Sequence, residues 1–389
     1  MDQPMTKARA LCRIVTLGKP ATAKVNRIKY ERGSMSTQED LYPLTFEPIY
    51  KEKVWGGRGF EKLGRELPGD ANTGVGESWE IADLATTSVS GGGGNAEYSV
   101  VTDGALKGKS IRELMHSYGD ALLGEGIQPA DDGGFPLLIK FLDAKENLSI
   151  QVHPSPEYAV AHEDAYLKSE AWYIIDHEPG AVIYKGLAPG VTPEQLRAAL
   201  ETNTDEAVVP LLNAIEVKKG DCHYLPSGTL HALGAGVLAA EVQTPSDTTY
   251  RVYDWGRTDR ELHIEQAMAC IDFDGDASAE EEVMPSIPWT DGLSMSVAAA
   301  CEYFSILEFV CDSDTIFRSD EPADAPIGNH PTIYMPLSGQ ATITFTNGEV
   351  VELSAGKTLL VPASMIFIQS IEAKAGTTWL MAHPADPAR

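Results

Sequence analysis

The chain has 389 residues and is strongly acidic, with a formal net charge of -27 at pH 7. Nucleic acids and anionic membranes are bound through basic surfaces, so this charge argues against both as partners. A phosphorylated ligand is still compatible with it, because a few local Lys and Arg side chains can form its site. Hydrophobic residues make up 43% of the chain, and the length favours two globular domains over one.

The cysteine pattern indicates the compartment. The five cysteines are widely spaced, and no C-x-x-C occurs. This favours free thiols in a reducing compartment over a disulfide framework. No apolar run reaches the roughly eighteen residues of a membrane span, and the start lacks the apolar core of a secretory signal. We therefore expect a cytoplasmic protein, either a monomer or a homodimer.

The first residues differ from the rest of the chain. Residues 1–34 are rich in Lys and Arg, their acidic residues are Asp2 and Glu31, and they show no clear apolar periodicity. Met35 opens a stretch that resembles an ordinary N-terminus. We expect residues 1–38 to be a basic extension without fixed structure or an artefact of an upstream start site. A targeting segment is the alternative.

From Tyr42 onward, short apolar runs are broken by Gly and Pro, which predicts strands. The clearest runs are Ser78–Ala82, Leu137–Leu142, Leu148–Val152, Trp172–Ile175 and Ala181–Tyr184. Three segments predict helices instead: Ser110–Leu123, which has apolar residues at helical spacing, residues 155–167, and Thr192–Leu200, which has Pro193 at its first position.

The last third of the chain has a different pattern. Residues 272–288 are acidic and irregular, which predicts a linker. Strands are then predicted at Tyr303–Cys311, Thr332–Pro336, Gln340–Thr346, Val350–Leu353, Thr358–Val361 and Thr377–Ala382. Short strands with regular turns, such as Asn347-Gly348, are typical of a small antiparallel barrel or sandwich.

The segment Leu148–Pro154 carries the first functional signal. Alternate side chains of a strand share a face. Ser149, Gln151 and His153 are therefore expected on one face, and Ile150 and Val152 on the other. A lone His in a strand is more often structural than functional, so its interpretation depends on what lies beside it.

A second motif changes that interpretation. Gly220–His231 has the pattern G-x5-P-x-G-x2-H, which resembles the second conserved motif of cupins, whose His is a metal ligand. Glu170, at the mouth of an apolar strand, would complete a set of nitrogen and oxygen donors with Gln151 and His153. Such a set leaves an open position, as catalytic zinc sites do. The same donors could hold iron or manganese.

Several independent motifs resemble those of type I phosphomannose isomerases, in the short bacterial branch of this cupin family. They are Trp55–Gly57, Gly76–Glu80, Pro136–Pro154, Lys168–Tyr173, Glu241–Arg251 and Tyr253–Arg257. The resemblance implies a mainly β protein of two cupin-like jelly-roll β-barrel domains. The first, at 39–271, would carry the metal and helical insertions, and the second, at 289–389, would have no metal ligands.

The resemblance also implies residue roles. One Zn²⁺ per chain would be bound by Gln151, His153, Glu170 and His231. Arg251, Glu241 and Lys168 would be catalytic, and Lys140, Ser149 and Arg257 would bind substrate. The family often has Lys six positions after the catalytic Arg, where this chain has Arg257.

The implied reaction interconverts mannose 6-phosphate and fructose 6-phosphate through a cis-enediol. A metal suits it as a Lewis acid, and Arg251 suits it as a fixed cation for the enediolate. The proton shuttle stays open between Glu241, Lys168 and water on the metal, with Glu241 preferred. Lys140, Lys168 and Arg257 are the candidates for the phosphate.

Two other functions compete with the isomerase. One is another metal-dependent cupin enzyme, such as an iron dioxygenase or a glucose 6-phosphate isomerase. The block Glu241–Arg251 and the insert between His153 and Glu170 argue against it. The other is a non-catalytic sugar-binding cupin, and the complete donor set together with Arg251 argues against that.

Overall fold

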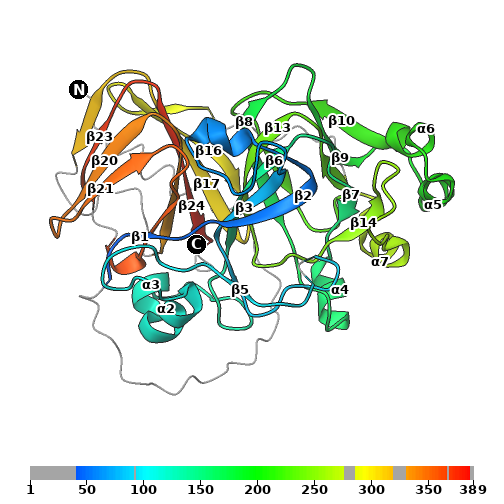
Figure 1. The fold of residues 1–389 in the computed structure, drawn as a ribbon, viewed down its shortest axis with the longest axis horizontal. Coiled ribbons are helices and arrows are strands. Elements are labelled where there is room, and N and C mark those ends of the chain that lie inside the picture. The colour runs from blue at the N-terminus through cyan, green and yellow to red at the C-terminus, as the bar shows by residue number, and fades with distance from the viewer. Residues whose placement is uncertain (1–40, 92, 276–284, 319–329, 366–367, 386–389) are drawn as a thin grey trace. The chain divides into compact units, whose positions relative to one another are not determined.

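Figure 1 shows the fold of the computed structural model, which describes residues 41–91, 93–275, 285–318, 330–365 and 368–385. The expectation of a mainly β protein is confirmed, since strands predominate and pair antiparallel. The predicted extension at 1–38 and most of the predicted linker at 272–288 lie outside the described residues. The end of that linker segment enters a strand, which begins at Ile287.

The described residues form two compact units. The site unit comprises those of Phe46–Ser99 and Ala130–Met284, and the C-terminal unit comprises those of Met1–Thr45, Val100–Pro129 and Pro285–Arg389.

The site unit contains a six-stranded sheet of order β11-β8-β13-β6-β2-β3, a five-stranded sheet of order β10-β9-β12-β7-β14 and the pair β4-β5. Its strands are β2 (Ile49–Gly57), β3 (Val75–Ile81), β4 (Asp83–Leu84), β5 (Glu97–Tyr98), β6 (Leu138–Ala144), β7 (Ile150–Val152), β8 (Glu170–His177), β9 (Val182–Leu187), β10 (Leu212–Glu216), β11 (Cys222–Leu225), β12 (His231–Leu233), β13 (Val237–Gln243) and β14 (Tyr250–Tyr253). Its helices are α4 (Pro156–Ala161), α5 (Pro193–Thr202), α6 (Asp205–Val208), α7 (Ile264–Cys270) and the 3₁₀ helices η2 (Gly59–Leu63) and η3 (Val209–Leu211).

The C-terminal unit contains a seven-stranded sheet of order β1-β22-β19-β24-β17-β16-β15 and a four-stranded sheet of order β18-β23-β20-β21. Its strands are β1 (Leu44–Thr45), β15 (Ile287–Thr290), β16 (Leu293–Ala300), β17 (Phe304–Cys311), β18 (Thr315–Arg318), β19 (Thr332–Ser338), β20 (Gln340–Phe345), β21 (Val350–Ser354), β22 (Leu359–Val361), β23 (Ile368–Ala373) and β24 (Thr377–Pro384). Its helices are α2 (Ile111–Tyr118), α3 (Asp120–Leu123) and the 3₁₀ helix η5 (Ala363–Met365). Both sheets contribute to one apolar core, in which Phe309 and Trp379 stack with ring centroids 5.1 Å apart.

The two faces of β7 explain where the site lies. Ile150 and Val152 are fully buried, in one cluster with Leu196 and Leu200 of α5 and Ala267 of α7. Figure 1 shows α5, α6 and α7 beside β9, β10 and β14. Helices therefore cover one face of the five-stranded sheet, and the opposite face carries the polar side chains of β7.

The predicted strands all have counterparts in the structure, with ends shifted by at most three residues. The helices differ more. The segment Ser110–Leu123 divides into α2 and α3 at Gly119, which has a φ of 46°. Of residues 155–167, only Pro156–Ala161 is helical.

The helical segment 100–129 belongs to the C-terminal unit, whereas the sequence analysis placed it in the first domain. Within that unit, Thr102 donates its backbone N–H to Thr45, and α3 contacts η5. Hydrophobic periodicity shows that a helix has an apolar face but not which core covers that face. For this reason the segment was expected in the domain of its neighbours along the chain.

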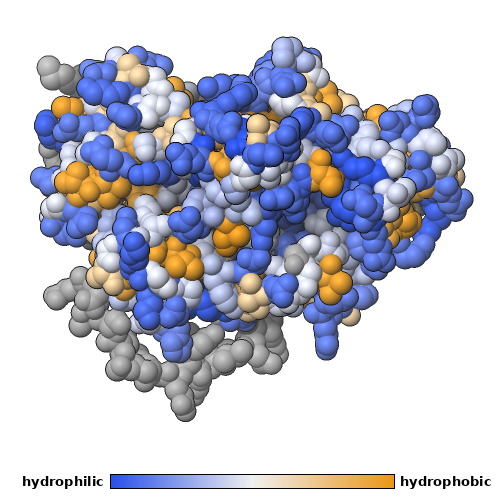
Figure 2. Space-filling model, viewed as in Figure 1, coloured by the Kyte–Doolittle hydropathy of each residue, from blue (hydrophilic) through white to orange (hydrophobic). Residues whose placement is uncertain are grey.

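The surface of the described residues agrees with the composition. Figure 2 shows a face that is mainly hydrophilic, with small separated hydrophobic groups. Among the described residues, we find no helix with the length and apolar character needed to cross a membrane.

The N-termini of two neighbouring helices provide a test of helix capping. The Thr192 hydroxyl accepts from Gln195 N and the Gln195 side chain accepts from Thr192 N, whereas Thr204, at the start of α6, makes no side-chain cap bond. We expect Thr192→Ala to lower the free energy of unfolding by about 1 kcal/mol, and Thr204→Ala to lower it by clearly less. Urea unfolding followed by circular dichroism compares them, and equal losses would contradict a stabilising role for the Thr192 cap.

Candidate active site

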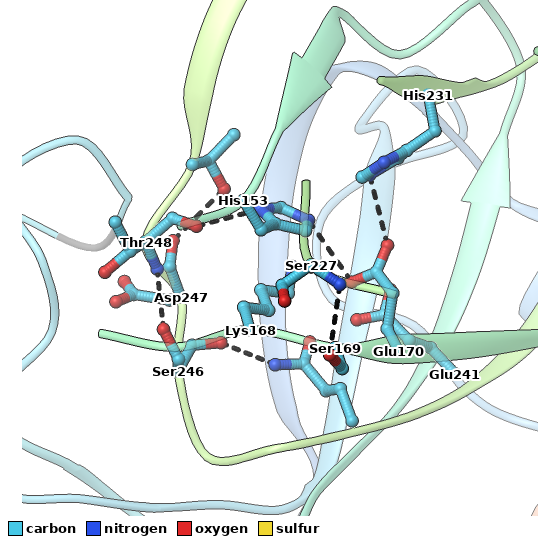
Figure 3. A network of polar contacts seen from close by, with 12 residues as sticks. His153, Lys168, Ser169, Glu170, Ser227, His231, Glu241, Ser246, Asp247 and Thr248 are labelled. Carbon is cyan, nitrogen blue, oxygen red and sulfur yellow. Dashed lines mark hydrogen bonds and ion pairs between the residues drawn. The ribbon is translucent and has the colours of Figure 1, made fainter. Parts of the chain in front are cut away.

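Three buried side chains from the two sheets of the site unit meet at one point. Glu170 begins β8 of the six-stranded sheet, His231 begins β12 of the five-stranded sheet, and His153 directly follows β7. Glu170 Oε2 lies 3.4 Å from His153 Nε2, and Glu170 Oε1 lies 3.3 Å from His231 Nε2. Figure 3 shows both imidazoles directed at this carboxylate. One donor atom from each residue lies within 4.8 Å of the others, close enough to hold a metal ion.

Main-chain carbonyls orient the two imidazoles. Thr248 O lies 2.9 Å from His153 Nδ1, and Thr229 O lies 2.8 Å from His231 Nδ1. Because a carbonyl can only accept, each Nδ1 carries the proton and donates it. Each Nε2 is then left with a free electron pair facing Glu170, as in protein metal sites.

The electrostatics of these residues also suit a metal. Burial, reinforced by the Lys168 ammonium, lowers the pKa of His153 to about 3, so its imidazole is neutral. Burial alone would raise the pKa of Glu170, but the Lys168 ammonium holds it well below its usual range. Within the described residues, both Nε2 atoms and Glu170 Oε1 are buried without a hydrogen-bond partner, and Glu170 Oε2 lies 2.9 Å from the Lys168 ammonium. Such groups are costly unless an ion satisfies them, so the donor set fits a divalent cation.

A row of side chains crosses the five-stranded sheet beside this donor set. Gln151 of β7 lies directly opposite His231 of β12 on one side and Arg251 of β14 on the other. Opposite residues of an antiparallel pair share a face, so the three side chains are neighbours. The structure therefore brings Gln151 beside the buried donors, and its role as a ligand stays a prediction.

A matching row crosses the six-stranded sheet. Trp172, Glu241, Lys140 and Trp79 are opposite one another on β8, β13, β6 and β3. Lys140 Nζ lies 3.0 Å from Glu241 Oε1, and the Trp172 indole donates to Glu241 Oε2 at 3.3 Å. Both oxygens of the Glu241 carboxylate are thus held in a fixed orientation.

Burial affects the two charged members of this row differently. Burial, and then the charge of Glu170, raise the pKa of Glu241, which brings this carboxyl closer to the range of a proton shuttle. Burial alone would lower the pKa of Lys140, but Glu241 and Glu77 raise it instead. Lys140 therefore stays charged beside Glu241.

Arg251 is held by two neutral hydrogen-bond acceptors. Its Nε donates to the Ser149 hydroxyl at 3.2 Å, and its Nη1 donates to Glu261 O at 2.9 Å. Burial and the charge of Arg260 lower its pKa, yet an arginine remains cationic at any working pH.

A cavity of about 210 Å³ lies between these rows. Of the predicted site residues, the cavity lining includes Lys140, Ser149, Gln151, Lys168, Glu241 and Arg251. His153, Glu170 and His231 form the buried cluster described above. Arg257 is not among the lining residues of the described chain. It bonds instead to Asp254 and to Asn147 O.

Several further residues that line the cavity were not predicted from the sequence. They are Lys51, Lys53, Trp79, Trp172, Asp247 and Arg260. The spacing of Lys51 and Lys53 on β2, and of Glu170 and Trp172 on β8, could have shown that each pair shares a face. Arg260 follows no strand pattern, so only the folded loop reveals its position.

Comparisons with known proteins agree with this geometry. Residues 44–184 match the family described as phosphomannose isomerase type I, catalytic domain. Mannose-6-phosphate isomerase ManA of Bacillus subtilis (strain 168) is 36% identical over 72% of this chain and 83% of its own length. The crystal structure of mannose 6-phosphate isomerase from Bacillus subtilis has a TM-score of 0.72 and 30% identity, covering 88% of this chain and 99% of that one. A mannose 6-phosphate isomerase bound with zinc and yttrium has the same fold, with a TM-score of 0.60 and 15% identity over 88% of this chain and 99% of its own.

Removing one imidazole tests the donor set. We expect His231→Ala to lower the content of bound divalent metal strongly, because the remaining donors no longer enclose an ion. His162→Ala, which removes an exposed imidazole at the end of α4, should retain the metal. Elemental analysis of both purified variants measures this, and full metal occupancy in His231→Ala would exclude His231 as a ligand.

Proposed function

This chain belongs to the type I phosphomannose isomerase family, and we propose that it interconverts mannose 6-phosphate and fructose 6-phosphate with one zinc ion held by its buried donor set. Gln151, His153, Glu170 and His231 would bind that ion. Two imidazoles, one carboxylate and one amide oxygen are donors that zinc accepts. In the described part of the chain, the cluster of His153, Glu170 and His231 is the group of this kind that we find.

The charge of the cavity is the observation that carries the proposal. In a chain with a net charge of -27, the cavity beside the donor set is lined by more cations than carboxylates: Lys51, Lys53, Lys140, Lys168, Arg251 and Arg260 against Glu77, Glu241 and Asp247. A cleft with an excess of one sign of charge concentrates a ligand of the opposite sign. A sugar phosphate combines the anionic group that these cations attract with hydroxyl and carbonyl oxygens for the buried donor set.

The proposed proton transfer uses Glu241. Isomerisation through a cis-enediol moves a proton between C1 and C2, and one carboxylate placed beside both carbons can remove and return it. Lys140 and Trp172 fix the Glu241 carboxylate, so its position does not change between the two transfers. Lys168, 2.9 Å from Glu170 Oε2, remains the alternative shuttle.

The negative charge that develops on the substrate oxygens needs fixed positive charge. Arg251 supplies it from the five-stranded sheet, with Ser149 and Glu261 O setting its orientation. A bound zinc ion would add Lewis-acid polarisation of the same oxygens. Lys140 and Ser149 then line the substrate space, whereas Arg257, for which the family resemblance implied substrate binding, is not among the described lining residues.

We further propose that both units are cupin-like jelly-roll β-barrels and that the C-terminal unit has a structural role without a metal. The competing assignments, another metal-dependent cupin enzyme or a non-catalytic sugar-binding cupin, lack the support of the family motifs. No disulfide joins the four described cysteines, which supports a cytoplasmic location. A monomer or homodimer remains our proposal for the assembly.

A direct assay tests the proposed function. Purified chain is mixed with mannose 6-phosphate, and fructose 6-phosphate is followed before chelation, after chelation and after zinc is returned. We expect turnover that is lost on chelation and restored by zinc. Absence of turnover in zinc-loaded protein would reject the substrate, and turnover unaffected by complete metal removal would reject the zinc-dependent mechanism.

The role of Glu241 gives a second test. We expect Glu241→Gln to lower kcat by roughly 100-fold or more with zinc content unchanged, because the amide keeps the shape but cannot take up the proton. Glu201→Gln, which makes the same change on the exposed side of α5, is the matched control. Steady-state kinetics and metal analysis compare the variants, and near-normal kcat in Glu241→Gln would transfer the shuttle role to Lys168.

A further inference from the structure

The cations around the cavity differ in whether a carboxylate already neutralises them. Each cavity lysine lies within 3.0 Å of one: Lys51 with Glu97, Lys53 with Glu77, Lys140 with Glu241 and Lys168 with Glu170. Because each of these pairs is neutral overall, the lysines contribute less to the excess of positive charge than their number suggests. The uncompensated positive charge of the cavity must therefore lie elsewhere.

Three arginines gather around one buried carboxylate at the end of β14. Asp254 is 1% exposed, and both Arg257 and Arg260 pair with it. The third guanidinium is that of Arg251, which makes no ion pair among the described residues. Burial, and then the charges of Arg260 and Arg257, lower its pKa. The two carboxylates that pair with these arginines, buried Asp254 and exposed Glu146, leave one of the three guanidinium charges in excess, which suits a phosphate.

The two arginines that pair with Asp254 face different surroundings. Arg257 donates from Nε to Asp254 Oδ1, from Nη2 to Asp254 Oδ1 and Asn147 O, and from Nη1 to Glu146. All three of its nitrogens are thus engaged away from the cavity. Arg260 uses Nε and Nη2 on Asp254 and lines the cavity beside Arg251. Its Nη1 is the nitrogen not committed to Asp254.

The loop that carries Arg260 is anchored at both ends. Trp255 adopts a φ of 53° and donates its indole N–H to Leu148 O at 2.6 Å. At the other end, His263 N donates to Arg251 O at 2.7 Å. Because these bonds tie the loop to β14 and to the segment just before β7, the guanidinium is positioned before a ligand arrives, which lowers the entropy lost on binding.

We propose that the substrate's phosphate binds at Arg260 beside Arg251, and that Arg257 instead locks Asp254 to the turn at residues 146–147. This inference rests on the proposed sugar-phosphate isomerase activity. It assigns the anionic end of the substrate of that reaction to the loop after β14. The sugar then extends from this loop toward the buried donor set.

Inorganic phosphate is the probe for this subsite. The zinc-loaded full chain is titrated with it by calorimetry, and the same protein is assayed for KM and kcat with mannose 6-phosphate. R260Q and R257Q are compared with R197Q, which removes an exposed guanidinium from α5. Circular dichroism and zinc content show that each variant is folded and loaded.

For R260Q we expect the Kd for phosphate and the KM to rise roughly 10- to 100-fold, as when a charged hydrogen bond to a ligand is lost, while kcat falls less. R257Q should weaken phosphate binding far less than R260Q and should lower the Tm, and R197Q should bind phosphate like the wild type. Wild-type phosphate affinity and KM in R260Q, or a loss confined to R257Q, would overturn the assignment. A phosphate affinity lost in R260Q together with no turnover by the wild type would reject the isomerase proposal and keep the subsite.

Discussion

The structure depends on keeping one ionised carboxylate, Glu170, almost completely out of water. An isolated buried charge costs several kcal/mol, so the fold must supply compensating groups on every side. It does so with the Lys168 ammonium, while two imidazole nitrogens from the other sheet direct their free electron pairs at the same carboxylate. A cation at the centre of this set would satisfy the remaining donor capacity, which is why the local geometry points to a metal centre more strongly than any single residue does.

The register of the strands places further functional side chains around the cavity beside this carboxylate. The row through Gln151 on one sheet and the row through Glu241 on the other place acid, base and cation around a single cavity. The period of two along each strand sends the alternate side chains, such as Ile150 and Val152, into the apolar core. Core stability and site geometry are therefore set by the same alternation, and a one-residue slip of β7 would disrupt both.

The alternation was readable in the sequence, and so was the grouping of Ser149, Gln151 and His153. The motif spacing also indicated that His231 and Glu170 would join them, and the structure brings His153, Glu170 and His231 together. Features that arise only in three dimensions were not readable. Neither the contact of Arg260 with the cavity nor the assignment of 100–129 to the C-terminal unit follows from local periodicity. Arg257 and Arg260 have the same chemistry and nearby positions, and only loop geometry separates them.

The buried donors also have a topological consequence. His153, Glu170 and His231 come from three separate parts of the chain and from two different sheets. One ion bound to all three would act as a reversible cross-link that closes two consecutive loops, residues 153–170 and 170–231, and closing loops restricts the unfolded chain more than the folded one. Metal supply would then govern the lifetime of the folded chain as well as its chemistry, because the free ion concentration sets how often the sheets separate far enough for a protease to enter.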